Sequence, residues 1–326
     1  MTAVLDVRDV SVSIRLPGDR FVHAVDQVSL RVEPSEIVAV VGESGCGKTM
    51  LAMSVLGLLP AGAEITSGEV RFGDEDLRRV SAARMRDIRG REIGTIFQEP
   101  MSSLNPVLTI GRQIGEVVER HEHMSGGQAR TRTLELLGLV GIPDPKRRID
   151  QYPHEMSGGM AQRALIALAI ACKPLLLLAD EPTTALDVTI QAGILRVIDD
   201  LRRQLKMAVV LITHDLGVVS DIADRVLVMY AGRAVEQADV LDLFAAPQHP
   251  YTLGLLGAVR HPERTEPRSR LPEIPGIVPT MFAPASACTF APRCTRADDR
   301  CRTELPPLGL QRPEHSVACF HPGSGR

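Results

Sequence analysis

The feature that most constrains this chain is a glycine-rich loop, Gly42 to Thr49, with the spacing G-x-x-x-x-G-K-T. An apolar run, 37–41, precedes the loop, and an apolar segment with helical character, Met50 to Leu59, follows it. Strand, glycine loop and helix in that order form a P-loop, in which backbone N–H groups surround phosphate oxygens. Lys48 is expected to reach the β and γ phosphates, and the Thr49 hydroxyl to hold Mg²⁺. The expected nucleotide-binding residues here are Gly42, Ser44, Gly45, Cys46, Gly47, Lys48, Thr49 and Met50.

Composition favours a globular protein. The chain has 326 residues, of which 24% are charged and 44% hydrophobic, and its net charge is −3 without a long basic run. That balance argues against nucleic acid as a partner. No apolar stretch reaches the roughly 18 residues that a membrane span needs, and the N-terminus has no secretory pattern. We therefore expect an intracellular chain whose connection to a membrane, if it has one, runs through partner proteins.

Hydrophobic patterning predicts an α/β fold. Alternating apolar residues between Leu5 and Val32 indicate a small antiparallel sheet that leads into the P-loop strand, and 67–73 reads as another short strand. Helical spacing dominates from about Gln98 to Arg163. The apolar run 175–180 suits a strand buried on both faces of a parallel sheet. Helix 189–205 and the strands 209–213 and 226–230 continue a layered core.

Two carboxylates follow that buried strand. Asp180 ends it and Glu181 comes next, so after a P-loop we expect Asp180 to orient Mg²⁺ and Glu181 to polarise the attacking water. A solvated turn is the alternative for such a pair taken alone. Upstream, Ser157 can cap a helix whose first turn contains Gly158 and Gly159, which offers a second place for phosphate. An ordinary helix cap is the alternative there.

The end of the chain differs in composition. Residues 261–313 are rich in proline and arginine, so we expect an irregular extension without long helices. Four of the six cysteines lie in the last 40 residues: Cys288, Cys294, Cys301 and Cys319. Their spacing is not the Cys-x-x-Cys pair usual for structural zinc, and four thiolates also suit a 4Fe-4S cluster. Zinc, and cysteines that are reduced or disulfide-bonded, are the alternatives. We expect a structural role, because a proline-rich segment with few apolar residues needs a cross-link to become ordered. The sequence offers no evident route from this segment to the nucleotide, which argues against a redox role.

These motifs together resemble the ATP-binding subunit of an ABC transporter, and closely its oligopeptide/dipeptide branch, over essentially the whole length. Gly42 to Thr49 is similar to Walker A, the stretch around Gln98 to the Q-loop, and 175–180 to Walker B. Ser157, Gly158 and Gly159 resemble the signature, 185–187 the D-loop, and His214 the switch histidine. The stretches 152–155 and 249–252 are the specific marks of the peptide-uptake branch.

The resemblance implies an ABC cassette with a mixed sheet core, an antiparallel β subdomain and a helical subdomain. It assigns residues 1–250 to the cassette, about 99–165 to the helical subdomain, and 251–326 to an extension with a four-cysteine metal site, where this branch carries a 4Fe-4S cluster. Gln98 would join Thr49 around Mg²⁺, and Glu181 and His214 would be catalytic. Ser157, Gly158, Gly159 and Asp187 would act on the ATP bound by a second subunit.

The implied function is ATP hydrolysis that drives peptide import. The implied partners are a second, distinct ABC ATPase subunit, two transmembrane permease subunits and an extracytoplasmic binding protein, with the chain at the cytoplasmic face of the membrane. Import of another solute such as a nickel chelate, or a soluble ABC protein acting on ribosomes or DNA, are the alternatives.

Three departures from the family pattern matter. Ile14 stands where the family often has an aromatic residue on adenine, so that contact is expected to be weak or to fall to Phe21 or His23. Ala161 replaces a basic residue in the signature. Ser125 begins a signature-like stretch, but it lies too far upstream, and we interpret it as the cap of the helix through Leu134 and Leu137.

Overall fold

A computed structural model describes residues 2–184, 186–258 and 274–323. The predicted Ala185 of the D-loop and the prolines at 262, 267 and 272 lie outside these ranges. The chain divides into two compact units. The first consists mainly of Arg79–Ile212 with Val32–Ile37, and the second of Leu5–Arg31, Val38–Arg78 and the chain from Thr213 onward.

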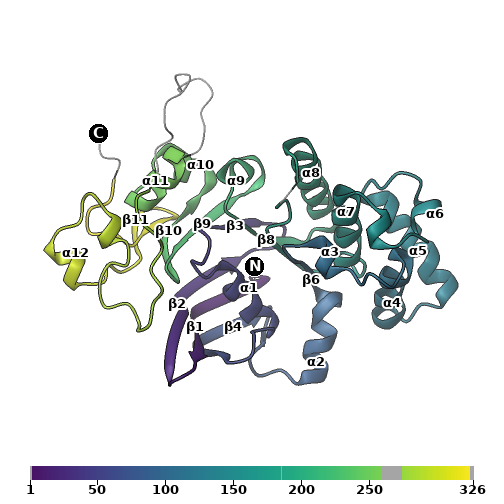
Figure 1. Cartoon of the computed structure of the whole chain (residues 1–326), viewed down its shortest axis with the longest axis horizontal. Coiled ribbons are helices and arrows are strands. Elements are labelled where there is room, and N and C mark those ends of the chain that lie inside the picture. Colours follow the sequence, from purple (N-terminus) through teal and green to yellow (C-terminus); the bar gives the residue numbers. More distant parts are fainter. Residues whose placement is uncertain (1, 185, 259–273, 324–326) are drawn as a thin grey trace. The chain divides into compact units, whose positions relative to one another are not determined.

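The first unit combines parallel strands with helices (Figure 1). Strands β6 (Ile93–Ile96), β7 (Leu176–Asp180) and β8 (Ala208–Thr213) pair in parallel, with β7 in the middle. Every residue of β7 and β8 is buried, as a strand covered on both faces requires. Strands β7 and β8 were predicted from the sequence, and β6 was not.

Helices make up the rest of that unit. They are α2 (Ala82–Asp87), the irregular η1 (Ile88–Glu92), α3 (Pro100–Ser103), α4 (Ile110–Glu122), α5 (Gly126–Leu139), α6 (Pro145–Arg148), η2 (Pro153–Glu155), α7 (Gly158–Ala169) and α8 (Val188–Leu205). Helix α7 is central, since it contacts α3, α4, α5 and α8. Buried alanines on α7, among them Ala161, Ala164 and Ala167, allow this close packing.

The second unit contains two sheets. One has the order β2-β1-β4-β5, from β1 (Leu5–Leu16), β2 (Arg20–Val32), β4 (Ala63–Phe72) and β5 (Glu75–Asp76). Strands β1 and β4 are antiparallel, and the register shifts between Arg8 and Ser11. This confirms the predicted antiparallel subdomain.

The other sheet of the second unit contains the P-loop strand. Strand β3 (Ile37–Val41) runs parallel to β9 (Arg225–Tyr230), β9 pairs antiparallel with β10 (Arg233–Asp239), and β10 pairs with β12 (His315–Val317). Strand β11 (Gly309–Arg312) completes a hairpin with β12. The helices of this unit are α1 (Lys48–Leu56), α9 (Leu216–Ile222), α10 (Val240–Ala245), α11 (Pro250–Ala258), η3 (Ala291–Arg293) and α12 (Asp299–Thr303).

The C-terminal extension is anchored by a buried carboxylate on β10. Glu236 has no exposed surface and accepts hydrogen bonds from the backbone N–H groups of Gln248 (2.6 Å) and His249 (2.9 Å). The Nε2 atom of His315, on β12, lies 2.7 Å from the Oε1 atom of the same carboxylate. One carboxylate therefore joins β10, the start of α11 and the hairpin. The extension is less irregular than predicted, because it adds two strands to the sheet.

Candidate nucleotide site and cysteine pocket

The P-loop runs directly from β3 into α1 and is pressed against neighbouring backbone. A Cβ atom on Gly42 would lie 2.2 Å from the Met229 carbonyl oxygen, and one on Gly47 would lie 2.2 Å from that of Ala24. Both glycines have positive φ, 152° and 104°. Only glycine fits these two positions. Of the other predicted loop residues, Ser44 and Gly45 are exposed, Cys46 is buried, and Thr49 and Met50 are half-buried in the first turn of α1.

Lys48 is buried and turned back onto its own loop. Its Nζ atom donates to the carbonyl oxygens of Gly42 (2.7 Å) and Glu43 (3.0 Å). An ammonium group held at the mouth of a glycine loop suits a phosphate, which offers stronger, charged acceptors than peptide carbonyls. The geometry matches the arrangement expected for a triphosphate.

In the first unit, two residues predicted separately come together. Glu181 follows β7, and its Oε2 atom accepts hydrogen bonds from Gln98 Nε2 (2.9 Å) and Thr184 Oγ1 (2.8 Å). Glu181 adopts a left-handed backbone (φ 47°) and donates its N–H to Ile212 O (2.8 Å). Asp180, the last residue of β7, is buried. Thr184, three residues after Glu181, was not predicted from the sequence.

The two predicted serine caps are confirmed. Ser157 is the N-cap of α7, its hydroxyl accepts from Met160 N–H (3.4 Å), and Gly158 is exposed. Ser125 caps α5, where Gln128 Oε1 accepts from Ser125 N–H (3.0 Å). The signature-like stretch that begins at Ser125 therefore has the capping role expected for it. Asp187 also caps a helix, α8, through Ile190 N–H (3.0 Å).

His214 belongs to the second unit. It is exposed and follows β8, while the next residue, Asp215, caps α9 through Gly217 N–H (2.8 Å). In the same unit, the His23 ring hydrogen-bonds Ser13 Oγ (3.1 Å), and Phe21 is 39% exposed. Ile14 lies on β1 opposite Ala63.

Comparison with known proteins decides the family. The family model described as "ABC transporter" matches residues 25–184, and that described as "Oligopeptide/dipeptide transporter, C-terminal region" matches residues 235–301. A probable peptide ABC transporter ATP-binding protein of Sinorhizobium fredii is 52% identical over 97% of this chain and 94% of its own length. The chain belongs to the ABC transporter ATP-binding family.

Other relatives agree with this assignment. The dipeptide transport ATP-binding protein DppD of Bacillus subtilis is 48% identical over 98% of this chain and 95% of its own, and that of Escherichia coli 44% over 98% and 97%. Among solved structures, the dimeric ABC cassette MJ0796 bound to ADP and Pi has a TM-score of 0.65 at 27% identity, covering 72% of this chain and 98% of that one. The fold is thus an ABC cassette, and the protein is an ATPase of that family. Family members of the importer type work with membrane permease subunits, and in the described part of this chain no helix has the length and apolarity to cross a membrane.

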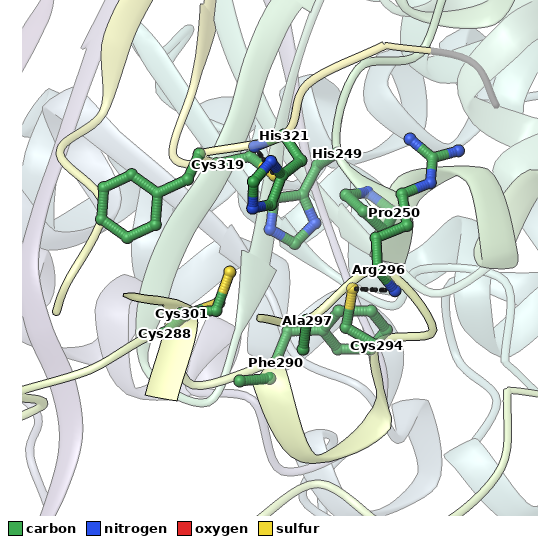
Figure 2. Close-up of a pocket in the computed structure, with 12 residues that line it drawn as sticks. His249, Pro250, Cys288, Phe290, Cys294, Arg296, Ala297, Cys301, Cys319 and His321 are labelled. Carbon is green, nitrogen blue, oxygen red and sulfur yellow. Dashed lines mark hydrogen bonds between the residues drawn. The ribbon is translucent and has the colours of Figure 1, made fainter. Parts of the chain in front are cut away.

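Four cysteines near the end of the chain lie around one small pocket; they are Cys288, Cys294, Cys301 and Cys319. Figure 2 shows their side chains with His249, Phe290 and His321 around a common space. None of the cysteines forms a disulfide, and all are in the described residues. Burial raises the pKa of Cys288, Cys301 and Cys319, that of Cys319 to about 11, and the neighbouring cysteine sulfurs raise each further. Thiols that disfavour one another's ionisation become thiolates when a cation binds among them.

Two further groups stand at the rim of this pocket. The Asp298 carboxylate accepts from Cys301 N–H (2.9 Å) and pairs with His321 Nε2 (2.8 Å), and the hydrogen bonds from Cys301 lower the pKa of Asp298 to about 2. Ligand atoms of Asp298, Cys301 and His321 lie within 4.8 Å of one another. His249 is buried, which lowers its pKa to about 3, and its Nδ1 accepts from Tyr251 N–H (3.1 Å). His249 is therefore neutral.

Proposed function

We propose that this protein is the ATP-hydrolysing subunit of an ABC importer that takes up peptides. The observation that supports it is the union, in one chain, of a complete P-loop with a region that matches the oligopeptide/dipeptide transporter C-terminal family. Relatives named for peptide and dipeptide transport align over nearly the whole chain. The stretch beginning at His249 contributes Tyr251, whose hydroxyl accepts from Glu43 N–H in the P-loop (2.8 Å).

Within this proposal, the P-loop residues hold the triphosphate. Lys48 exchanges its two carbonyl partners for phosphate oxygens, while Thr49 and Gln98 bind Mg²⁺ and Asp180 orients it. Glu181 polarises the attacking water, and Gln98 and Thr184 keep its carboxylate in place. His214 contacts the γ phosphate.

The remaining site residues act between subunits. Ser157, Gly158, Gly159 and Asp187 reach the ATP of a second ABC subunit, a distinct relative of this chain. Two permease subunits attach the pair to the cytoplasmic face of the membrane, and an extracytoplasmic protein delivers the peptide. We keep as part of this proposal the predicted boundary between the cassette, 1–250, and the extension, 251–326, and the helical subdomain of about 99–165.

The importer assignment is tested by uptake and by purification. A strain that lacks this chain should lose uptake of a radiolabelled dipeptide, and the native chain should restore it while the Glu181→Gln variant should not. An affinity-tagged chain should co-purify with two multi-spanning membrane proteins. Normal dipeptide uptake in the deletion strain, together with purification of the tagged chain free of membrane proteins, would contradict the proposal.

We also propose that Cys288, Cys294, Cys301 and Cys319 hold a 4Fe-4S cluster. All four side chains line one small pocket. Their spacing along the chain is not the Cys-x-x-Cys pair usual for structural zinc. The four cysteines fit a 4Fe-4S cluster as its thiolate ligands.

Anaerobic purification tests the nature of this centre. The protein should be brown and carry about four irons per chain, and replacing Cys294 by Ser should lower the iron content. Colourless protein with one zinc per chain would show that the site holds zinc instead of a cluster. Metal-free protein with a fully ordered extension would show that the site holds neither.

A further inference from the structure

Glu43 of the P-loop is held from three sides. Its N–H donates to Tyr251 Oη (2.8 Å), and its carbonyl oxygen accepts from Lys48 Nζ (3.0 Å). Its carboxylate forms a two-pronged ion pair with Arg293, with Nη1 at 2.7 Å from Oε2 and Nη2 at 3.0 Å from Oε1. All four residues belong to the second unit. The residue that accepts the P-loop lysine is thus tied to the cysteine-rich extension.

Arg293 is built into this position. Its side chain is only 5% exposed, against 31% for Glu43. Every nitrogen of the guanidinium is used, since Nε donates to Pro275 O (2.8 Å), Nη2 to Ile274 O (3.0 Å) and Nη1 to Tyr230 Oη (3.4 Å), besides Glu43. The guanidinium carbon also lies 5.7 Å from the centre of the Tyr230 ring. A planar donor fixed at all its nitrogens holds its carboxylate partner in one place.

The same arginine is part of the turn that carries two pocket cysteines. It is the last residue of η3, and Cys294 follows it directly. Ala291 N–H donates to Cys288 O (3.1 Å), and Cys294 N–H to Ala291 O (3.3 Å). Cys288 and Cys294 line the pocket, while Arg293 between them reaches the P-loop. Arg293 therefore links the turn that carries these two cysteines to the P-loop.

We propose that Arg293 is a positioning residue for ATP: it fixes and neutralises Glu43, and so couples the cysteine centre to the affinity of the P-loop. This rests on the nucleotide and metal assignments of the proposed function. Without Arg293 the Glu43 carboxylate stays charged and partly buried in a loop that must receive a triphosphate. Its negative charge then repels the phosphates, and the loop loses its preorganised shape. No such route was expected from the sequence.

Affinity for Mg·ATP, measured by calorimetry on the full chain, tests the positioning role. The Arg293→Gln variant should bind roughly 5- to 50-fold more weakly, the range of coupling between contacting charged groups. The turnover rate at saturating ATP should fall less than the affinity. Arg296→Gln is the matched control, because Arg296 comes from the same segment, lines the same pocket and bonds Gly323 O instead of the P-loop. It should bind ATP like the native chain.

A double variant separates charge from folding. Glu43→Gln combined with Arg293→Gln should recover most of the affinity that Arg293→Gln alone loses, because the double variant leaves no unpaired carboxylate beside the phosphates. Native affinity in Arg293→Gln, or an equal loss in Arg296→Gln, would overturn the positioning role. If Arg293→Gln does not fold by circular dichroism, Arg293→Lys takes its place. It keeps the charge and loses the two-pronged geometry, so it should lose less affinity than expected for Arg293→Gln, and native affinity in Arg293→Lys would overturn the positioning role.

Removal of the bound metal tests the coupling. Protein stripped of the cysteine-bound metal, freed of chelator and returned to Mg²⁺ buffer should bind Mg·ATP more weakly than untreated native chain, whereas the same treatment should change the affinity of Arg293→Gln no further. An unchanged affinity after chelation would overturn the coupling and leave the positioning role. These measurements need neither permease nor cargo, so they succeed or fail independently of the peptide uptake assay.

Discussion

Lys48 is a buried charged residue that bonds its own loop and can exchange those bonds for bonds to phosphate. It is 5% exposed, and its ammonium is bonded to two loop carbonyls. Phosphate oxygens are better partners for it than carbonyls, because those bonds join opposite charges. Replacing this residue therefore removes binding energy without creating a large cavity in the sheet.

Lys48→Ala should weaken Mg·ATP binding roughly 10- to 100-fold, since a hydrogen bond to a charged group contributes about 1.5–3 kcal/mol. Calorimetry of the purified chain measures this. Lys146→Ala, an exposed lysine on α6, is the control and should leave affinity unchanged. Undiminished ATP affinity in Lys48→Ala would contradict the P-loop assignment.

Glu181→Gln should keep ATP bound and lower turnover roughly 10²–10⁴-fold, the effect of losing a general base. The amide retains the shape of the side chain and an oxygen that can accept from Gln98 and Thr184. Turnover is measured in the assembled transporter with the partner site disabled, because the two sites of a heterodimer need not be equally active. Parental turnover would show that another group activates the water.

Residue-level prediction succeeded where a motif is continuous in sequence. Lys48, Asp180 and the cap Ser157 lie where the spacing placed them. Glu43 and Arg293 were not predicted as partners, because 250 positions separate them and neither has a local pattern that requires the other. Tyr251 was noted only for its family resemblance, and its contact with the P-loop emerged from the fold.

At the scale of elements, two helices begin with nearly the same letters and differ in what surrounds them. Ser125 and Gln128 bond each other at the start of α5, which satisfies that helix end locally. At α7, Ser157 caps the helix through Met160, and Gly158 is exposed. Among the described residues, a Cβ atom added to Gly158 would meet Leu186 Cδ2, at 3.7 Å. Both helix starts are exposed, and the bond between Ser125 and Gln128 is what distinguishes α5.

Gly158→Asp should block transport while leaving ATP bound at Lys48, because it puts a negative charge where the partner's γ phosphate must approach. Ser125→Ala should leave transport intact. Dipeptide uptake and equilibrium ATP binding, measured side by side for both variants, check this pair. The opposite result, with Ser125→Ala inactive and Gly158→Asp active, would mean that α5 carries the signature.

Element prediction failed where strands are short. Strand β6 has four residues and β12 three, too few to display a period of two. Strand β12 exists because it pairs with β10 and because His315 meets Glu236, and both partners lie about 80 positions upstream. Such strands are defined by tertiary contacts, which a single sequence does not display.

Across the whole molecule, the extension depends on one buried pair. Glu236 and His315 are 0% and 1% exposed. Removing one partner of a buried hydrogen bond leaves the other polar group unsatisfied, which costs about 1–3 kcal/mol.

His315→Ala should therefore loosen the extension and expose it to limited proteolysis before the cassette is cut. The rate of cleavage after residue 258 and the thermal midpoint measure this, with His154→Ala, an exposed histidine, as the control. Glu236→Gln should also loosen the extension, because its single amide oxygen can accept from only one of the two backbone N–H groups, which bond different oxygens of the carboxylate. Equal protease resistance in His315→Ala and the native chain would show that the pair does not hold the extension.

The hairpin of β11 and β12 has a consequence for solubility. Without this hairpin one edge of β10 would be unpaired, and an unpaired strand edge can pair with another chain. Here β12 occupies that edge and β11, with Leu310, Gln311 and Arg312 exposed, becomes the new border. The segment that carries the cysteines therefore replaces the edge of the seven-residue β10 by that of the four-residue β11, and a short edge strand is less able to pair with another chain.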